Sequence, residues 1–242
     1  MCTVTVVPHD RGVRLVCNRD EQRTRSVALP PQIYDLGGRL AVFPLDPQGG
    51  GTWIGVNDAG IVISLLNLKG ATPATRNRTQ GSRGLIVRNL LHCASLPHAI
   101  ALAENLDPRA FEAFRVVIVH DGRVAVGTSD GIASIRCTEQ RLDRPLLFTS
   151  SSLGDAVVGP PRERLFERMV VRNSTGWLGG QTRYHQHQWP HRPDISVRME
   201  RRDALTVSRT TLDVTNGNRQ VLYEAPLDGA APERVRECCS LH

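Results

Sequence analysis

The feature that most constrains the fold is a pair of short apolar runs at the start of the chain. Residues 3–7 read Thr-Val-Thr-Val-Val, and residues 13–17 form a second run that is also rich in valine. Alternation with a period of two residues is typical of a β-strand. Residues 9–12 between the runs are of types that favour a turn. The sequence therefore predicts a β-hairpin that brings residues 18–20 next to Cys2.

Cys2 carries the chemistry that this hairpin would position. Removal of Met1 by an aminopeptidase would leave Cys2 with a thiol and a free α-amine on neighbouring carbons. An α-amine with a pKa of about 7.7–8.0 can take the proton of the thiol, so one residue supplies nucleophile and base. Asp20 can orient the amine, and the guanidinium of Arg19 can favour the thiolate. The competing interpretation is that Cys2 is only a small apolar residue packed in the core.

Three motifs together resemble those of a known family. They are Asn-Arg-Asp-Glu at residues 18–21, Gly-Gly-Thr-Trp at residues 50–53 and Asn-Asp-Ala-Gly at residues 57–60. A chain with this combination resembles the NRDE family, which includes the transport and Golgi organisation 2 proteins and is related to the N-terminal-nucleophile (Ntn) hydrolases. The resemblance is dense over residues 1–70 and thinner afterwards.

The secondary-structure pattern indicates a mixed fold with largely antiparallel strands. Helices are expected over residues 83–93, 95–105 and 160–171, and strand patterns dominate both ends of the chain. The resemblance implies more: an α+β fold with a four-layer αββα sandwich of the Ntn-hydrolase kind. We predict a single domain over residues 1–228, followed by a frayed tail over residues 229–242.

The resemblance also implies site residues beyond the hairpin. In related cysteine-type hydrolases an asparagine at the place of Asn67 helps to hold the oxyanion, an interaction commonly worth about 2.7–4 kcal/mol; the alternative is a turn asparagine at a strand end. A second asparagine near the substrate is replaced here by Ser150 or Ser151. We assign these serines, Asn18 and Arg209 to substrate binding. Arg209 would bind an anionic group, unless it is only a surface cation.

Arg19 departs from the pattern of bile-salt-hydrolase-like enzymes. Those enzymes have an arginine immediately before the asparagine, where this chain has Cys17, and Arg19 follows Asn18 instead. We expect Arg19 either to contact the thiol of Cys2 or to serve structure on the opposite face of its strand.

The composition argues against nucleic-acid binding and against a metal site. The net charge is +6, but the cations are almost all arginines scattered among acids, and aromatic residues make up only 5%. Six cysteines show neither zinc spacing nor the density of a disulfide scaffold, so reduced thiols are expected. His185, His187 and His191 lack the additional ligands of a known zinc motif, and a loop with solvated histidines is predicted. We expect no cofactor.

Hydropathy predicts a cytoplasmic protein. No apolar run approaches the roughly 18 residues that a membrane span requires. The start of the chain passes directly into the polar-interrupted hairpin, so no signal peptide is expected.

Two functions remain open at this point. The leading hypothesis is an N-terminal-cysteine hydrolase that cleaves a non-peptide amide C–N bond of a small-molecule amide or acyl substrate through an acyl-enzyme. The alternative is a non-catalytic carrier of haem or a lipid, of the transport and Golgi organisation 2 type, that uses the same pocket.

Overall fold

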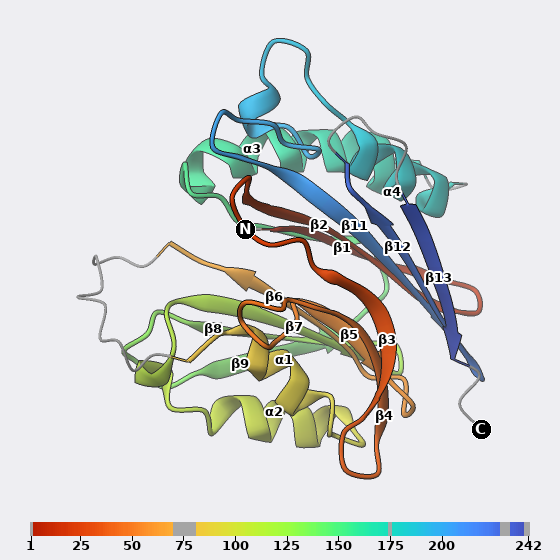
Figure 1. The fold of residues 1–242 in the computed structure, drawn as a ribbon. Coiled ribbons are helices and arrows are strands. Elements are labelled where there is room, and N and C mark those ends of the chain that lie inside the picture. Colours follow the sequence, from red (N-terminus) through yellow and green to blue (C-terminus); the bar gives the residue numbers. More distant parts are fainter. Residues whose placement is uncertain (1, 70–80, 174–175, 228–232, 240–242) are drawn as a thin grey trace. The chain divides into compact units, whose positions relative to one another are not determined.

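The computed structural model describes residues 2–69, 81–173, 176–227 and 233–239. The chain divides into two units, each built on one antiparallel sheet (Figure 1). The first unit comprises Met1–Arg25, Leu142–Asn216 and Gln220–Arg236. The second comprises Ser26–Arg141 with the short pieces Gly217–Arg219 and Glu237–His242. The single domain predicted over residues 1–228 stays a prediction, because the two units are defined separately.

The sheet of the first unit has six strands in the order β10-β1-β2-β11-β12-β13. The two strands of the predicted hairpin are second and third in this order, so the N-terminal strand has a hydrogen-bonded neighbour on each side. The strands are β1 (Cys2–His9), β2 (Gly12–Gln22), β10 (Leu146–Thr149), β11 (Ala204–Thr215), β12 (Asn218–Ala225) and β13 (Glu233–Cys239).

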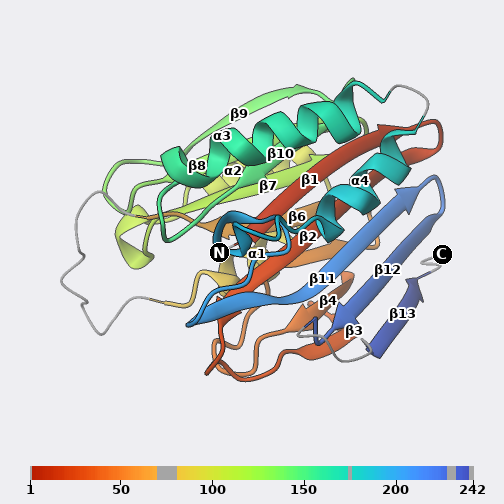
Figure 2. The same ribbon diagram turned by 90° about the horizontal axis from the view of Figure 1, so that it is seen from above.

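Two helices cover one face of this sheet. α3 (Asp155–Phe166) contacts β10, and α4 (Trp177–Gln186) contacts β1 and β2. Figure 2 shows both helices lying over these strands. A π-helical turn, η2 (Glu167–Val171), continues α3, and a 3₁₀ turn, η3 (Pro193–Ile195), follows α4. The apolar layer between helices and sheet is a cluster of buried residues: Val7, Leu165, Phe166, Val170, Tyr184 and Val197.

The β1–β2 hairpin confirms the prediction made from the first twenty-one residues. Its register pairs Cys2 with Arg19, Thr3 with Asn18 and Val4 with Cys17. Paired residues of antiparallel strands point to the same face of a sheet. Thr3 and Asn18 therefore point to the helices, and Cys2 shares the opposite face with Cys17 and Arg19.

The sheet of the second unit has seven strands in sequence order, each paired with the next. Consecutive pairing of this kind is a meander, and the connection between its fourth and fifth strands carries two helices. The strands are β3 (Leu29–Asp35), β4 (Leu40–Leu45), β5 (Ile54–Asn57), β6 (Val62–Asn67), β7 (Phe114–His120), β8 (Arg123–Ser129) and β9 (Arg136–Arg141).

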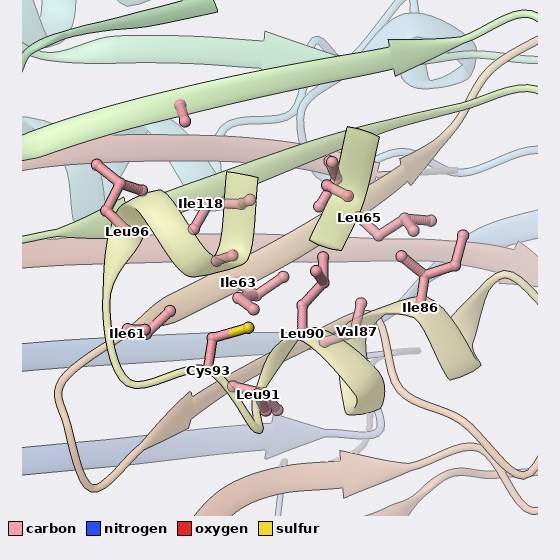
Figure 3. Packing of buried hydrophobic residues seen from close by; sticks show 14 of the residues in the cluster. Ile61, Ile63, Leu65, Ile86, Val87, Leu90, Leu91, Cys93, Leu96 and Ile118 are labelled. Atoms are coloured by element: carbon pink, nitrogen blue, oxygen red, sulfur yellow. The ribbon is translucent and has the colours of Figure 1, made fainter. Parts of the chain in front are cut away.

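Two helices and one short turn cover a face of this second sheet. α1 (Gly84–Leu90) packs on β5 and β6, and α2 (Leu96–Glu104) packs on β7, β8 and β9. The 3₁₀ turn η1 (Pro108–Ala110) leads into β7. Figure 3 shows the core between them, with Ile86, Val87, Leu90, Leu91 and Leu96 directed toward Ile61, Ile63, Leu65 and Ile118.

The Gly-Gly-Thr-Trp motif has a structural explanation. A Cβ atom on Gly51 would lie 2.3 Å from the backbone carbon of Gly84, at the start of α1. The backbone amide of Thr52 donates a hydrogen bond of 3.1 Å to the carbonyl of Gly84. The motif therefore lets the chain before β5 touch the helix backbone directly, which only glycine allows.

Two expectations about the C-terminal third differ from the structure. The sequence pattern of residues 193–198 predicts a strand, but Pro193 instead begins η3. Proline has no amide hydrogen for a sheet ladder, which favours the turn. Within the tail that was expected to be frayed, Glu233–Cys239 forms β13 at the edge of the first sheet; residues 229–232 and 240–242 of that tail lie outside the described residues.

Candidate active site

Cys2 is the first residue of β1 and is held through its backbone on the β10 side. The Cys2 amide donates a 3.3 Å hydrogen bond to Oγ of Ser150, and the Ser150 amide donates a 3.0 Å hydrogen bond to the Cys2 carbonyl. Only 4% of Cys2 is exposed. The nitrogen that would become the α-amine therefore has a hydroxyl partner. Met1, whose removal we predicted, lies outside the described residues.

The thiol of Cys2 is paired with the thiol of Cys17. A hydrogen bond from Cys17 is the main cause that lowers the pKa of Cys2, and Arg19 adds to it, while burial and Asp20 oppose it. Burial raises the pKa of Cys17 well above that of an ordinary thiol. Cys2 is therefore the sulfur that ionises first, and Cys17 keeps its proton. Cys17 was not among the expected site residues, although it is two residues from Arg19 in the strand and therefore lies on the same face.

Arg19 lies on the face of Cys2. The two residues are direct register partners, and Arg19 is 5% exposed. Its Nη2 lies 3.6 Å from Oε2 of Glu21, which Arg25 also approaches at 3.6 Å. The expectation that Arg19 could point to the opposite face is wrong, because Cys17 and Arg19 are two residues apart and so share a face.

Asp20 is buried near the same end of the hairpin. Its Oδ1 accepts a 2.6 Å hydrogen bond from Oγ1 of Thr206 on β11. Burial raises the pKa of Asp20, while the charge of Arg162 and the bond from Thr206 oppose that rise. Asp20 also acts electrostatically on Cys2, whose pKa it raises. The carboxyl group is thus close enough to influence the thiol, and its role in orienting the α-amine stays a prediction.

The two serines that were expected to bind substrate have protein partners. Oγ of Ser150 accepts the Cys2 amide. Oγ of Ser151 accepts a 2.9 Å hydrogen bond from Arg201, and the Ser151 amide donates to Asp155 at 3.1 Å. Ser150 therefore acts on the nucleophile residue itself, and Ser151 belongs to the connection between β10 and α3.

Asn18 is on the helix side of the sheet, away from the thiol. Its Nδ2 donates to the carbonyls of His185 and Val197 at 2.9 and 3.0 Å, and its Oδ1 lies 3.0 Å from Nδ1 of His185. The other ring nitrogen of His185 lies 2.7 Å from Oγ1 of Thr5. These contacts use all the polar atoms of the Asn18 side chain, which argues against the predicted substrate-binding role.

Arg209 also lies on the helix side, as the register partner of Asn18. Its guanidinium donates a 2.7 Å hydrogen bond to Oε2 of Glu224 on β12, and Arg234 approaches the other oxygen at 3.3 Å. Both side chains of this ion pair are nearly buried, so Glu224 is a structural partner of Arg209. This placement separates Arg209 from the face of Cys2 and argues against its predicted contact with an anionic substrate.

The sequence analysis missed a buried arginine beneath the hairpin. Arg162 on α3 is fully buried and donates to Oγ1 of Thr3 at 2.7 Å and Oγ1 of Thr149 at 2.9 Å. It also donates to the carbonyls of Ile195 at 3.0 Å and Ser196 at 2.5 Å. Arg162 thus joins β1, β10 and η3 and supplies positive charge to Asp20. An arginine among helical residues carried no signal that could have shown this.

Asn67, which was predicted to hold the oxyanion, belongs to the second unit. Asn67 is the last residue of β6, is half-buried, and pairs with Phe114 of β7. Its strand-end position matches the expectation, and its catalytic role stays a prediction.

Of the three histidines expected in a solvated loop, His185 is buried in a helix, whereas His191 is exposed. His185 lies in α4 and is 1% exposed, and burial first of all holds its pKa well below the usual range. Within the described ranges, no three His, Cys, Asp or Glu side chains are grouped so that they could hold a metal ion. Among the helices described, none is long and apolar enough to cross a membrane.

Solved structures define the class of fold. The chain is similar to a Caenorhabditis elegans N-acylethanolamine-hydrolyzing acid amidase orthologue, with a TM-score of 0.61 at 12% identity over 87% of this chain and 92% of the other. It is similar to penicillin V acylase from Agrobacterium tumefaciens, with a TM-score of 0.56 at 12% identity over 98% and 85%. It is also similar to a conjugated bile acid hydrolase variant from Clostridium perfringens, with a TM-score of 0.54 at 12% identity over 97% of this chain and 92% of the other.

These likenesses confirm the predicted fold, the αββα sandwich of the Ntn hydrolases with two antiparallel sheets. The chain belongs to the transport and Golgi organisation 2 family, whose model matches residues 1–153. That match includes Cys2, Asp20, Asn67 and Ser150, whereas Arg162 lies beyond it. A search of curated proteins finds no match.

Proposed function

We propose that this protein is an N-terminal-cysteine hydrolase that cleaves a non-peptide amide C–N bond in a small molecule through an acyl-enzyme. The observation that carries the proposal is the state of Cys2. Its nitrogen is hydrogen-bonded to Ser150, and its thiol, bonded to Cys17, has a lowered pKa. A structural cysteine in an apolar core would have a raised pKa instead.

The reaction would proceed in two steps. After removal of Met1, the α-amine of Cys2 takes the thiol proton, and the thiolate attacks the amide carbonyl. The C–N bond breaks as the amine nitrogen of the substrate takes that proton, which leaves a thioester on Cys2. A water molecule, deprotonated by the same α-amine, then attacks the thioester and releases the acid.

Three further residues have roles in this proposal. Asp20 and Ser150 orient the α-amine, and Asn67 donates from its amide to the oxyanion. Asp20 is supported by its electrostatic effect on Cys2, and Ser150 by its bond to the Cys2 nitrogen. The substrate class is supported by the amidase and acylases that share the fold.

The proposal is tested first by mass spectrometry and then by turnover. The mass of the intact protein shows whether Met1 has been removed. We expect the processed protein to hydrolyse members of a panel of N-acyl amides and Cys2→Ala to lose that turnover, since the nucleophile is gone. Cys93→Ala, which changes a buried thiol next to α1, is the matched control and should retain it. Equal turnover by Cys2→Ala and the wild type would refute the mechanism.

A carrier of haem or a lipid is the second candidate, favoured by the family match and by serine where related hydrolases have an asparagine. A carrier would bind haem or a fatty acid with an affinity that Cys2→Ala leaves nearly unchanged. Retention of Met1 in the native protein would favour this candidate, because Cys2 would then have no free α-amine to act as the base.

A further inference from the structure

The thiol pair is more than the proposed hydrolysis requires. Val4 is the register partner of Cys17, so Cys17 is the diagonal neighbour of Cys2 on the same face of the hairpin. Both side chains are buried, and the side chain of Cys17 is the main cause that lowers the pKa of Cys2. One thiol suffices for nucleophilic catalysis, and a second thiol beside it adds a chemistry of its own.

The two sulfur atoms differ in ways that assign them separate roles. Cys2 is 4% exposed, whereas Cys17 is fully buried, so a small oxidant reaches Cys2 first. The pKa of Cys2 is lowered, mainly by the bond from Cys17, and burial raises the pKa of Cys17. Peroxides react with thiolates, and a neighbouring thiol resolves the product.

We propose that Cys2 and Cys17 form a peroxide-oxidisable pair, in which Cys2 is the sulfur that reacts and Cys17 is the resolving thiol. In the first step the thiolate of Cys2 attacks one oxygen of hydrogen peroxide, the O–O bond breaks, and hydroxide leaves. The product is a sulfenic acid on Cys2, with sulfur oxidised and peroxide reduced by two electrons. In the second step Cys17 attacks the sulfenic sulfur, its proton goes to the leaving oxygen, and water departs as the disulfide forms.

The disulfide requires a small movement of the hairpin. Diagonal neighbours have Cα atoms about 7–8 Å apart, and the two sulfur atoms must close to about 2.05 Å. Cys2 is the first residue of β1, where the ladder has fewer pairs to disturb than in the middle of a strand. A disulfide closed under strain is more easily reduced, which suits a reversible modification.

The consequence for activity rests on the proposed function. While the disulfide stands, Cys2 has no thiolate and hydrolysis stops. A dithiol reductant reduces the disulfide to two thiols and is itself oxidised to a disulfide. The pair thereby spares the nucleophile from sulfinic and sulfonic acids, which simple thiols do not reverse.

The test is peptide mapping of the intact protein after treatment with hydrogen peroxide and blocking of free thiols with iodoacetamide. Trypsin cleaves after Arg11, Arg14 and Arg19, so Cys2 and Cys17 fall in different peptides. We expect one cross-linked species that joins the Cys2 peptide to residues 15–19 and that dithiothreitol separates. Because this readout is a covalent link, it stands whether or not the protein hydrolyses amides.

Substitution of Cys17 tests its role as the resolving thiol. In Cys17→Ser the cross-link should be absent, and Cys2 should accumulate as sulfinic and sulfonic acid several-fold faster than in the wild type. Cys93→Ser is the matched control and should cross-link normally. The proposal is overturned if wild-type Cys2 is over-oxidised without a cross-link, at the rate seen in Cys17→Ser. If Cys17→Ser does not fold, Cys17→Ala replaces it, and the wild-type map alone still decides.

Discussion

Single residues of the Asn-Arg-Asp-Glu sequence do different work because neighbours in a strand face opposite ways. Asn18 holds His185 on the helix side, and Arg19 lies beside Cys2 on the other. Asp20 binds Thr206 on β11, and Glu21 approaches Arg19. Asn18 therefore fixes α4 to the sheet, and Arg19 and Glu21 lie on the face of the nucleophile. Asp20 ties β2 to β11 and also acts electrostatically on Cys2.

The thiol of Cys17 should control the ionisation of Cys2. In Cys17→Ala the thiolate loses its hydrogen-bond donor, so the pKa of Cys2 should rise and its alkylation by iodoacetamide at neutral pH should slow. The measurement is the rate of alkylation at Cys2 against pH, followed by peptide mapping. Cys137→Ala, a cysteine on β9, should leave the profile in place. If Cys17→Ala and the wild type have the same profile, the thiol of Cys17 does not influence the pKa of Cys2.

Ser150 should affect turnover more than stability. Ser150→Ala removes the hydroxyl that accepts from the nitrogen of Cys2, so the amine loses an orienting partner. On the proposed mechanism we expect kcat to fall about tenfold to a hundredfold with little change in KM, in line with general-base contributions. Ser152→Ala, at an exposed neighbouring serine, is the control. A change confined to KM would assign Ser150 to substrate binding, as the sequence analysis expected.

At the scale of elements, α3 is joined to the sheet by one charged side chain. Arg162→Met removes four hydrogen bonds and the positive charge that most strongly opposes the rise in the pKa of Asp20. Losing one partner of a buried charged network costs about 3–5 kcal/mol. Urea unfolding should show this loss, whereas Arg164→Met, at an exposed position of the same helix, should change the free energy of unfolding by less than about 0.5 kcal/mol.

The contact between Gly51 and the start of α1 gives a second prediction at this scale. In Gly51→Ala the new methyl group meets the backbone of Gly84 at 2.3 Å, which side-chain motion cannot relieve. We expect a loss of about 1–3 kcal/mol by thermal or urea unfolding. Gly159→Ala in α3 has its nearest contact at 3.4 Å with a flexible side chain and should be neutral or stabilising. Comparable stability of the two variants would exclude the close approach.

Elements were predictable from the sequence where the local pattern was strong. The hairpin and a helix within residues 95–105 were confirmed, and Ser95 caps that helix. The Asn-Asp-Ala-Gly motif forms a turn that ends at Gly60, whose φ is 84°. The paired prolines at residues 30 and 31 predict a loop over residues 23–31, but residues 29–31 belong to β3, an edge strand in which missing amide donors cost little. The burial of His185 and Arg162 depends on contacts between segments more than 150 residues apart, which no local pattern contains.

For the whole molecule, the response of stability to acid follows from His185. Its folded-state pKa is depressed by burial, so the unfolded chain binds the proton first as the pH falls below about 6.5. The free energy of unfolding should therefore decline by up to about 1.4 kcal/mol per pH unit below that point. Urea unfolding at pH 7.5, 6.5 and 5.5 checks the slope.

Variants separate His185 from other acid effects. His185→Gln should be less stable at neutral pH, because Thr5 and Asn18 lose partners, but its stability should depend less on pH between 7.5 and 5.5. His191→Gln, at an exposed position, should keep the wild-type slope. A wild-type stability that stays constant over this range would contradict the assignment of a neutral, buried His185.

The overall architecture was accessible from sequence only through the family motifs. Patterning alone supports a mixed, largely antiparallel fold, and the combination of motifs at residues 18–21 and 50–53 added the αββα sandwich. Candidate residues on the hairpin followed from its register, which fixes Arg19 and Cys17 relative to Cys2. The position of Asn18 and Arg209 on the helix side did not follow from the sequence, because no local pattern shows which face the helices cover. Their roles in substrate binding stay predictions.

Because β1 is paired with a strand on each side, Met1 must be removed before the first sheet has formed. An aminopeptidase needs an extended, accessible N-terminus, and Cys2 is 4% exposed once β1 is hydrogen-bonded to β2 and β10. β10 ends at Thr149, so that second neighbour exists only after more than half of the chain has been translated. On the proposed mechanism, Met1 is therefore removed from the nascent chain on the ribosome. A protein that folds with Met1 in place keeps Cys2 without a free α-amine and stays inactive.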